Sequence, residues 1–85
     1  RETVSDIVTG IDPQFSIHDL RMVPGTTHTT LVFDCVVPPG YPTSSAALCD
    51  RICTEIAAYR PDIRCAIHIE ESYASLPHEA KTNRK

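Results

Sequence analysis

The sequence predicts one α+β domain with element order α-β-β-α-β, a two-layer sandwich in which a three-stranded mixed sheet carries two helices on one face. Three observations predict this fold class. The chain has 85 residues, enough for one small domain. Its 41% hydrophobic and 22% charged residues are typical of a globular protein. Apolar residues fall at helical spacing in two segments and form strand-like runs in three others.

A first helix is expected over residues 1–11. Gly10 and the Asp12–Pro13 pair mark its end, because glycine suits the position after a helix C-cap and proline cannot continue a helix. The helical spacing is carried by four apolar residues: Val4, Ile7, Val8 and Ile11.

Two strands follow the first helix. Residues 15–23 have the length of a strand and are followed by Pro24–Gly25, a turn signal. The stretch 26–30, rich in threonine, leads into a second strand that ends at Val37. Because the link between them is short, the two strands are expected to form an antiparallel hairpin.

The longer helix is expected between two proline signals. Residues 38–42 contain three prolines and a glycine and are therefore a connector. Thr43 or Ser44 can cap a helix that runs to about Tyr59 and is ended by Pro61. One stripe of this helix is apolar and should face the sheet: Leu48, Cys49, Ile52, Cys53 and Ile56.

The third strand is expected over residues 63–70. A strand followed by a helix and another strand forms a right-handed crossover, so the third strand should run parallel to the second. The domain then spans residues 1–72, and residues 73–85 form a polar tail expected to fray. One face of the sheet has no helix to cover it, which predicts a second copy or another domain against that face.

Charge and hydropathy exclude several kinds of partner. The formal net charge is −3, with 8 Lys+Arg against 11 Asp+Glu, so nucleic-acid binding through a basic patch is not expected. No apolar run approaches the roughly 18 residues that a membrane span needs. The chain opens at Arg1 without a signal peptide, and we expect it to be a piece of a longer protein.

The four cysteines are expected to be free. Cys35, Cys49, Cys53 and Cys65 all lie inside predicted helices or strands rather than in loops. This distribution is typical of buried thiols in a reducing compartment rather than of a disulfide framework. Cys49 and Cys53 are one helical turn apart and could bind a metal ion, but they lie on the apolar stripe, which favours a packing role.

Candidate metal ligands lie in the predicted strands. His68 and Glu70 should project from one face of the third strand, about 7 Å apart at the backbone, because strand side chains alternate. His18 lies in the first strand. Asp34 is a carboxylate in an otherwise apolar strand, where it needs a sheet edge, a hydrogen-bond partner or a cation. Taken singly, each of the four also has a purely structural explanation.

Other chemistry is not indicated. The sequence contains no glycine-rich phosphate loop, no G-x-S-x-G elbow, no C-x-x-C and no H-E-x-x-H motif, so we do not expect an enzyme. His28 falls in the predicted turn and His78 in the tail, and both are expected to be solvated.

Two short motifs carry a resemblance to a known family. The run Ile17-His18-Asp19-Leu20-Arg21, followed by a glycine turn and by Asp34 in the next strand, is combined with Ala66-Ile67-His68-Ile69-Glu70 near the end. Together, from Val4 to Glu70, they resemble the C-terminal domain of the cation diffusion facilitators, the cation efflux transporters.

The resemblance implies a place and a partner for the domain. In that family it follows six transmembrane helices, lies on the cytoplasmic side of the membrane and has a metallochaperone-like, ferredoxin-like α+β fold. It pairs as a V-shaped homodimer and binds divalent cations at or near the dimer seam. The family's ligand positions correspond here to His18, Asp34, His68 and Glu70. A further histidine early in the long helix of some zinc-transporting members is replaced by Ala47, which argues against a two-metal cluster.

The expected function is that of a soluble regulatory and dimerisation domain of a divalent-metal efflux transporter. Two imidazoles and two carboxylates suit Zn²⁺, with Mn²⁺, Fe²⁺ and Co²⁺ as alternatives. Free histidine titrates near pH 6.5 and binds metal only when neutral, so binding should weaken as the pH falls toward 6. An alternative function is an amino-acid-binding regulatory domain of the same architecture. A small hydrolase and a domain that dimerises without metal are further alternatives.

Overall fold

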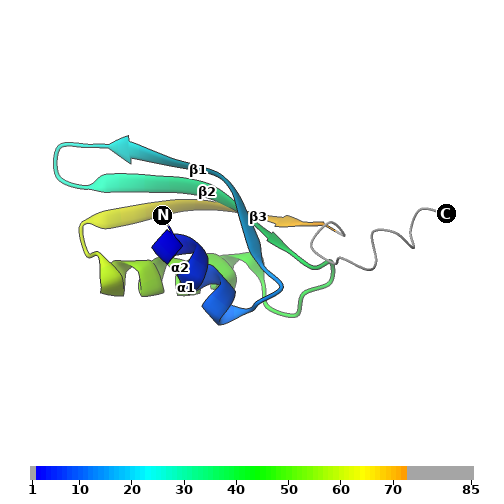
Figure 1. Cartoon of the computed structure of the whole chain (residues 1–85). Coiled ribbons are helices and arrows are strands. Elements are labelled where there is room, and N and C mark those ends of the chain that lie inside the picture. Colours follow the sequence, from blue (N-terminus) through cyan, green and yellow to red (C-terminus); the bar gives the residue numbers. More distant parts are fainter. Residues whose placement is uncertain (1, 73–85) are drawn as a thin grey trace.

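The computed structural model describes residues 2–72 of the chain, and the expected tail lies outside the described residues. The element order is the predicted α-β-β-α-β (Figure 1). No helix in the described part is long and apolar enough to cross a membrane. The five elements are α1 (Glu2–Ile11), β1 (Ser16–Pro24), β2 (Thr29–Val37), α2 (Ser45–Tyr59) and β3 (Ile63–Glu71).

The sheet has the order β1-β2-β3, with β2 in the centre. β1 pairs with β2 antiparallel and β3 pairs with β2 parallel, so both predicted pairings are confirmed. The two helices lie on the same face of this mixed sheet (Figure 1). Within residues 2–72 the opposite face carries no helix, and it is called the open face below.

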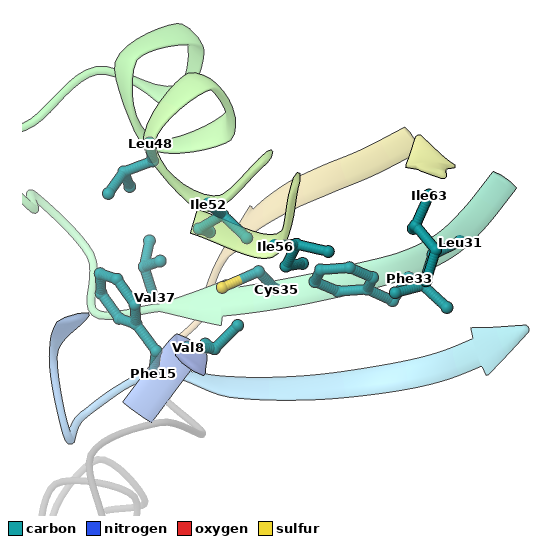
Figure 2. Close-up of a cluster of buried hydrophobic side chains, with 10 residues drawn as sticks. All are labelled: Val8, Phe15, Leu31, Phe33, Cys35, Val37, Leu48, Ile52, Ile56 and Ile63. Carbon is teal, nitrogen blue, oxygen red and sulfur yellow. The ribbon is translucent and has the colours of Figure 1, made fainter. Parts of the chain in front are cut away.

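The core lies between the helices and the sheet (Figure 2). Phe33 on β2 and Ile52 on α2, with exposed fractions of 1% and 0%, are the two largest fully buried side chains. Every second residue of β2 points into this layer, as expected for a strand. The cluster comprises Val8, Phe15, Leu31, Phe33, Cys35, Val37, Leu48, Ile52, Ile56 and Ile63.

The ends of the helices follow from local chemistry. Ser44 caps α2, because its side-chain oxygen accepts a hydrogen bond from the Ala47 backbone N–H at 3.1 Å. The helix ends at Tyr59, ahead of Pro61. One expectation for α1 was wrong: Gly10 lies inside the helix rather than after its C-cap, and the Asp12–Pro13 pair ends the helix.

A polar contact joins two loops beside the core. The Tyr41 hydroxyl donates to Asp12 Oδ2 at 2.6 Å, and the Gln14 backbone N–H donates to Asp12 Oδ1 at 2.9 Å. These hydrogen bonds, the tyrosine one first, lower the pKa of Asp12. The Tyr41 ring also packs edge-on against Phe15, with ring centroids 4.9 Å apart. The connector between β2 and α2 is thereby attached to the connector between α1 and β1.

The cysteines are free thiols, but only Cys35 is fully buried. Cys49, Cys53 and Cys65 are half-buried because they lie where α2 covers the edge strand β3 rather than the central strand. The Cys49 thiol donates a weak hydrogen bond to the Ile67 carbonyl, at 3.5 Å. Desolvation raises the pKa of Cys35 to about 11 and that of Cys65 to about 12.

These raised pKa values predict slow alkylation in the folded protein. Since the thiolate is the reactive form, a shift of the Cys35 pKa from 9.0 to about 11 lowers the thiolate population roughly 100-fold at pH 8. Iodoacetamide labelling of Cys35, followed by mass spectrometry of its peptide, should therefore be about 100-fold slower in buffer than in 8 M urea. Equal rates under the two conditions would contradict the buried placement of Cys35.

Candidate metal centre

The candidate ligands lie in register on the open face of the sheet. Asp34 on β2 is paired with His18 on β1 and with His68 on β3, so the three residues form one row across the sheet. Glu70 lies two residues beyond His68 on the same face of β3 and is paired with Val36. The expectation that His68 and Glu70 share a face is therefore confirmed.

Three of the four candidates form a compact group. Ligand atoms of Asp34, His68 and Glu70 all lie within 4.8 Å of one another, a spacing at which they could bind one ion. His68 Nδ1 is 3.7 Å from Asp34 Oδ1, too far for a hydrogen bond. The His68 side chain is 72% exposed and that of Asp34 is 31% exposed. The group therefore lies at the surface, where an ion can reach it without opening the fold.

The alternation of side chains along β2 determines which face of the sheet Asp34 points to. Its neighbours Phe33 and Cys35 point into the core, so the carboxylate points to the open face. The carboxylate is consequently only half-buried, in the central strand of the sheet and with the His68 imidazole beside it. Its solvation cost is therefore smaller than the apolar sequence around it implies.

His18 stands next to the compact group but is not part of it. It faces Asp34 across the β1–β2 pair and lines a surface hollow of about 460 Å³. The hollow is lined by Ser16, His18, Asp19, Asp34, Val36, Glu70 and Ser72.

Asp19 also lines the hollow, although strict alternation of side chains along β1 would place it on the other face of the sheet. A regular strand would turn Asp19 away from the face of His18. The register of β1 shifts between His18 and Arg21, however, and Asp19 has a φ of 55°. The register shows the irregularity: Ile17 and Met22 are paired with the inward-facing Cys35 and Leu31, although an odd and an even position cannot share one face of a regular strand.

The donor set fits a divalent transition-metal ion. One imidazole and two carboxylates, with His18 as a second imidazole, are nitrogen and oxygen ligands that suit Zn²⁺, Mn²⁺, Fe²⁺ or Co²⁺. Three protein ligands leave coordination positions open to water or to a further donor. Ala47 is exposed on α2, in the other layer, and offers no ligand atom.

Comparison with solved structures finds domains of the same fold. Two structures described as a zinc transporter, CzrB, one of them its zinc form, share 26% of their residues with this chain. The match to the first structure spans 84% of this chain and 94% of the CzrB chain, with a TM-score of 0.64. The match to the zinc form spans 84% of this chain and 86% of the CzrB chain, with a TM-score of 0.63. No protein-family model and no curated protein matches the sequence.

A third structure has the same fold. It is the metal-bound C-terminal domain of the CzcD transporter from Thermotoga maritima, with 22% identity, coverage of 82% of this chain and 88% of that one, and a TM-score of 0.64. The resemblance to the C-terminal domain of the cation diffusion facilitators, which the two motifs indicated, is thereby confirmed over most of the chain.

Proposed function

We propose that this chain is a regulatory, metal-binding domain of a divalent-cation efflux transporter. The observation that carries the proposal is the convergence of Asp34, His68 and Glu70, whose ligand atoms lie within 4.8 Å of one another in a fold shared with metal-transporter domains. In this proposal His18, which lines the adjoining hollow and faces Asp34 across the sheet, is the fourth ligand. The bound ion is Zn²⁺, with Mn²⁺, Fe²⁺ and Co²⁺ able to replace it.

The ion acts here as a signal and not as a catalyst. Ligands on β2 and β3 are held together only in the folded sheet, so metal binding stabilises that sheet. In this proposal the metal is transported by a membrane-spanning part that precedes the domain in the full protein. The domain itself lies on the cytoplasmic side of the membrane. In this proposal the domain has no enzymatic activity of its own.

A second copy of the chain covers the open face in this proposal. That face carries the candidate site but no helix within residues 2–72, so it is free to pack against a second copy. The coordination positions left free by three protein ligands lie on the same face, where a donor from the second copy can fill them. Metal binding then favours the closed arrangement of the homodimer and reports the metal concentration to the transporter.

Calorimetric titration of the whole chain tests the proposal. We expect saturable binding of ZnCl₂ and weaker binding of MnCl₂ at pH 7.5, and no heat with a panel of free amino acids, which tests the amino-acid-binding alternative. Sedimentation velocity with and without ZnCl₂ should show a metal-dependent dimer. Absence of dication binding would refute the metal-binding function, whereas a metal-bound monomer would refute only the dimer.

A further inference from the structure

Asp19 lies at a β-bulge beside the candidate site. Between the pairs His18–Asp34 and Arg21–Val32, β1 has two residues where β2 has only Phe33. Asp19 is the first residue of this bulge and has a φ of 55°, in the left-handed region. It is the only residue other than glycine with a positive φ among residues 2–72.

The bulge changes which residues face the candidate site. Adjacent residues of a regular strand point to opposite faces, yet His18 and Asp19 both line the hollow on the open face. Leu20, the second residue of the bulge, lines instead an apolar cleft beside α1 and α2, on the helix side of the sheet. The extra residue thus lets β1 present a histidine and a carboxylate side by side to Asp34 and Glu70.

The carboxylate of Asp19 makes no contact that would stabilise the described fold. It makes no hydrogen bond and no ion pair with any residue from 4 to 72. A left-handed φ costs free energy for every residue except glycine, and asparagine and aspartate bear that cost best. Glycine would satisfy the backbone at lower cost, so the backbone alone does not require an aspartate at this position.

We propose that Asp19 is a further metal-binding residue of the site and that the bulge exists to place it there. The proposal rests on the proposed metal-binding function. Asp19 adds an oxygen ligand from β1, beside His18, to the donors from β2 and β3. The set then holds two imidazoles and three carboxylates, which raises its share of hard oxygen ligands and its attraction for Mn²⁺ relative to Zn²⁺.

Two substitutions separate the carboxylate from the backbone. Asp19→Asn keeps the size and the tolerance of positive φ, and Asp19→Gly removes the strain as well as the carboxylate. We expect both variants to bind ZnCl₂ about 10-fold more weakly in calorimetric titration, with a larger loss for MnCl₂. The metal-free melting temperature should be unchanged for the asparagine variant and unchanged or higher for the glycine variant. Asp50→Asn, which removes an exposed carboxylate from α2, is the matched control and should bind metal like the wild type.

The outcomes distinguish this proposal from the proposed function. If Asp19→Asn binds metal within threefold of the wild type while His68→Ala loses binding, Asp19 is not a ligand and the metal site stands. If the asparagine variant loses affinity together with metal-free stability, Asp19 acts through the fold, and the proposal is overturned. If the wild type binds neither dication, both proposals fail.

Discussion

Replacement of His68 by alanine is expected to remove half or more of the metal-dependent stabilisation of the domain. His68 is the imidazole of the compact group with Asp34 and Glu70. In the wild type, metal at a hundredfold excess over Kd should stabilise the fold by about 2.7 kcal/mol, equivalent to a rise of roughly 10–20 °C in melting temperature for a domain of this size. Loss of a direct ligand should weaken binding by at least the roughly 10–100-fold that removal of an outer partner costs. Differential scanning calorimetry with and without ZnCl₂ measures the effect.

The control for this experiment is His28→Ala. His28 lies in the link between β1 and β2, where its Nδ1 contacts the hydroxyl of Thr27 at 3.1 Å, and it is absent from the candidate site. Its replacement should leave the metal-dependent rise intact. Lowering the pH from 7.5 to 5.5 should also shrink the rise in the wild type, because protons compete with the metal for histidine nitrogen. A full rise in His68→Ala would show that the ion binds elsewhere.

Replacement of Phe33 by alanine should strongly destabilise the metal-free protein. Phe33 is 1% exposed and lies in the centre of the only layer between helices and sheet in the described fold. A buried Phe→Ala change costs about 3–5 kcal/mol, and a chain of this length has a total stability of roughly 4–13 kcal/mol. Urea unfolding followed by circular dichroism should show a midpoint far below that of the wild type, or no folded baseline at all.

Tyr59→Ala provides the matched aromatic control. The Tyr59 side chain is 64% exposed at the end of α2, so its loss should change stability by no more than about 0.5 kcal/mol. Because Phe33 faces the core and the metal ligands face the other side of the sheet, saturating ZnCl₂ should partly restore the fold of Phe33→Ala. A Phe33→Ala variant as stable as the wild type would contradict the described core.

The architecture could be predicted because its signals are local and repeated. The apolar stripe of α2, the cap at Ser44 and the proline after Tyr59 each indicated the same helix. Parallel pairing of β2 with β3 followed from the helix between them, since a crossover of this length brings the next strand alongside in the same direction. The strands begin and end within a few residues of their expected limits.

The candidate site could be predicted only in part. Alternation placed His68 and Glu70 together because β3 is regular over its length. Asp34 joined them because the parallel register aligns it with His68, which no count of residues along the chain reveals. Asp19 was not predicted as a site residue, because it lies at a bulge, where a strand has one extra residue. The bulge is recognised only from the fact that Ile17, at an odd position, and Met22, at an even position, lie on the same face, and this requires knowing which residues point inward.

The bulge and the proline of β1 also bear on how copies of the domain can associate. β1 and β3 are the two margins of the sheet, and unpaired backbone at a margin invites intermolecular strand addition and fibrous aggregation. The bulge at Asp19 breaks the row of free amides in β1, and Pro24 at its end has no amide to donate. Arg64 and Glu71 give the opposite margin exposed charges of both signs. Both margins are therefore poor templates for a foreign strand, which directs self-association to the faces of the molecule.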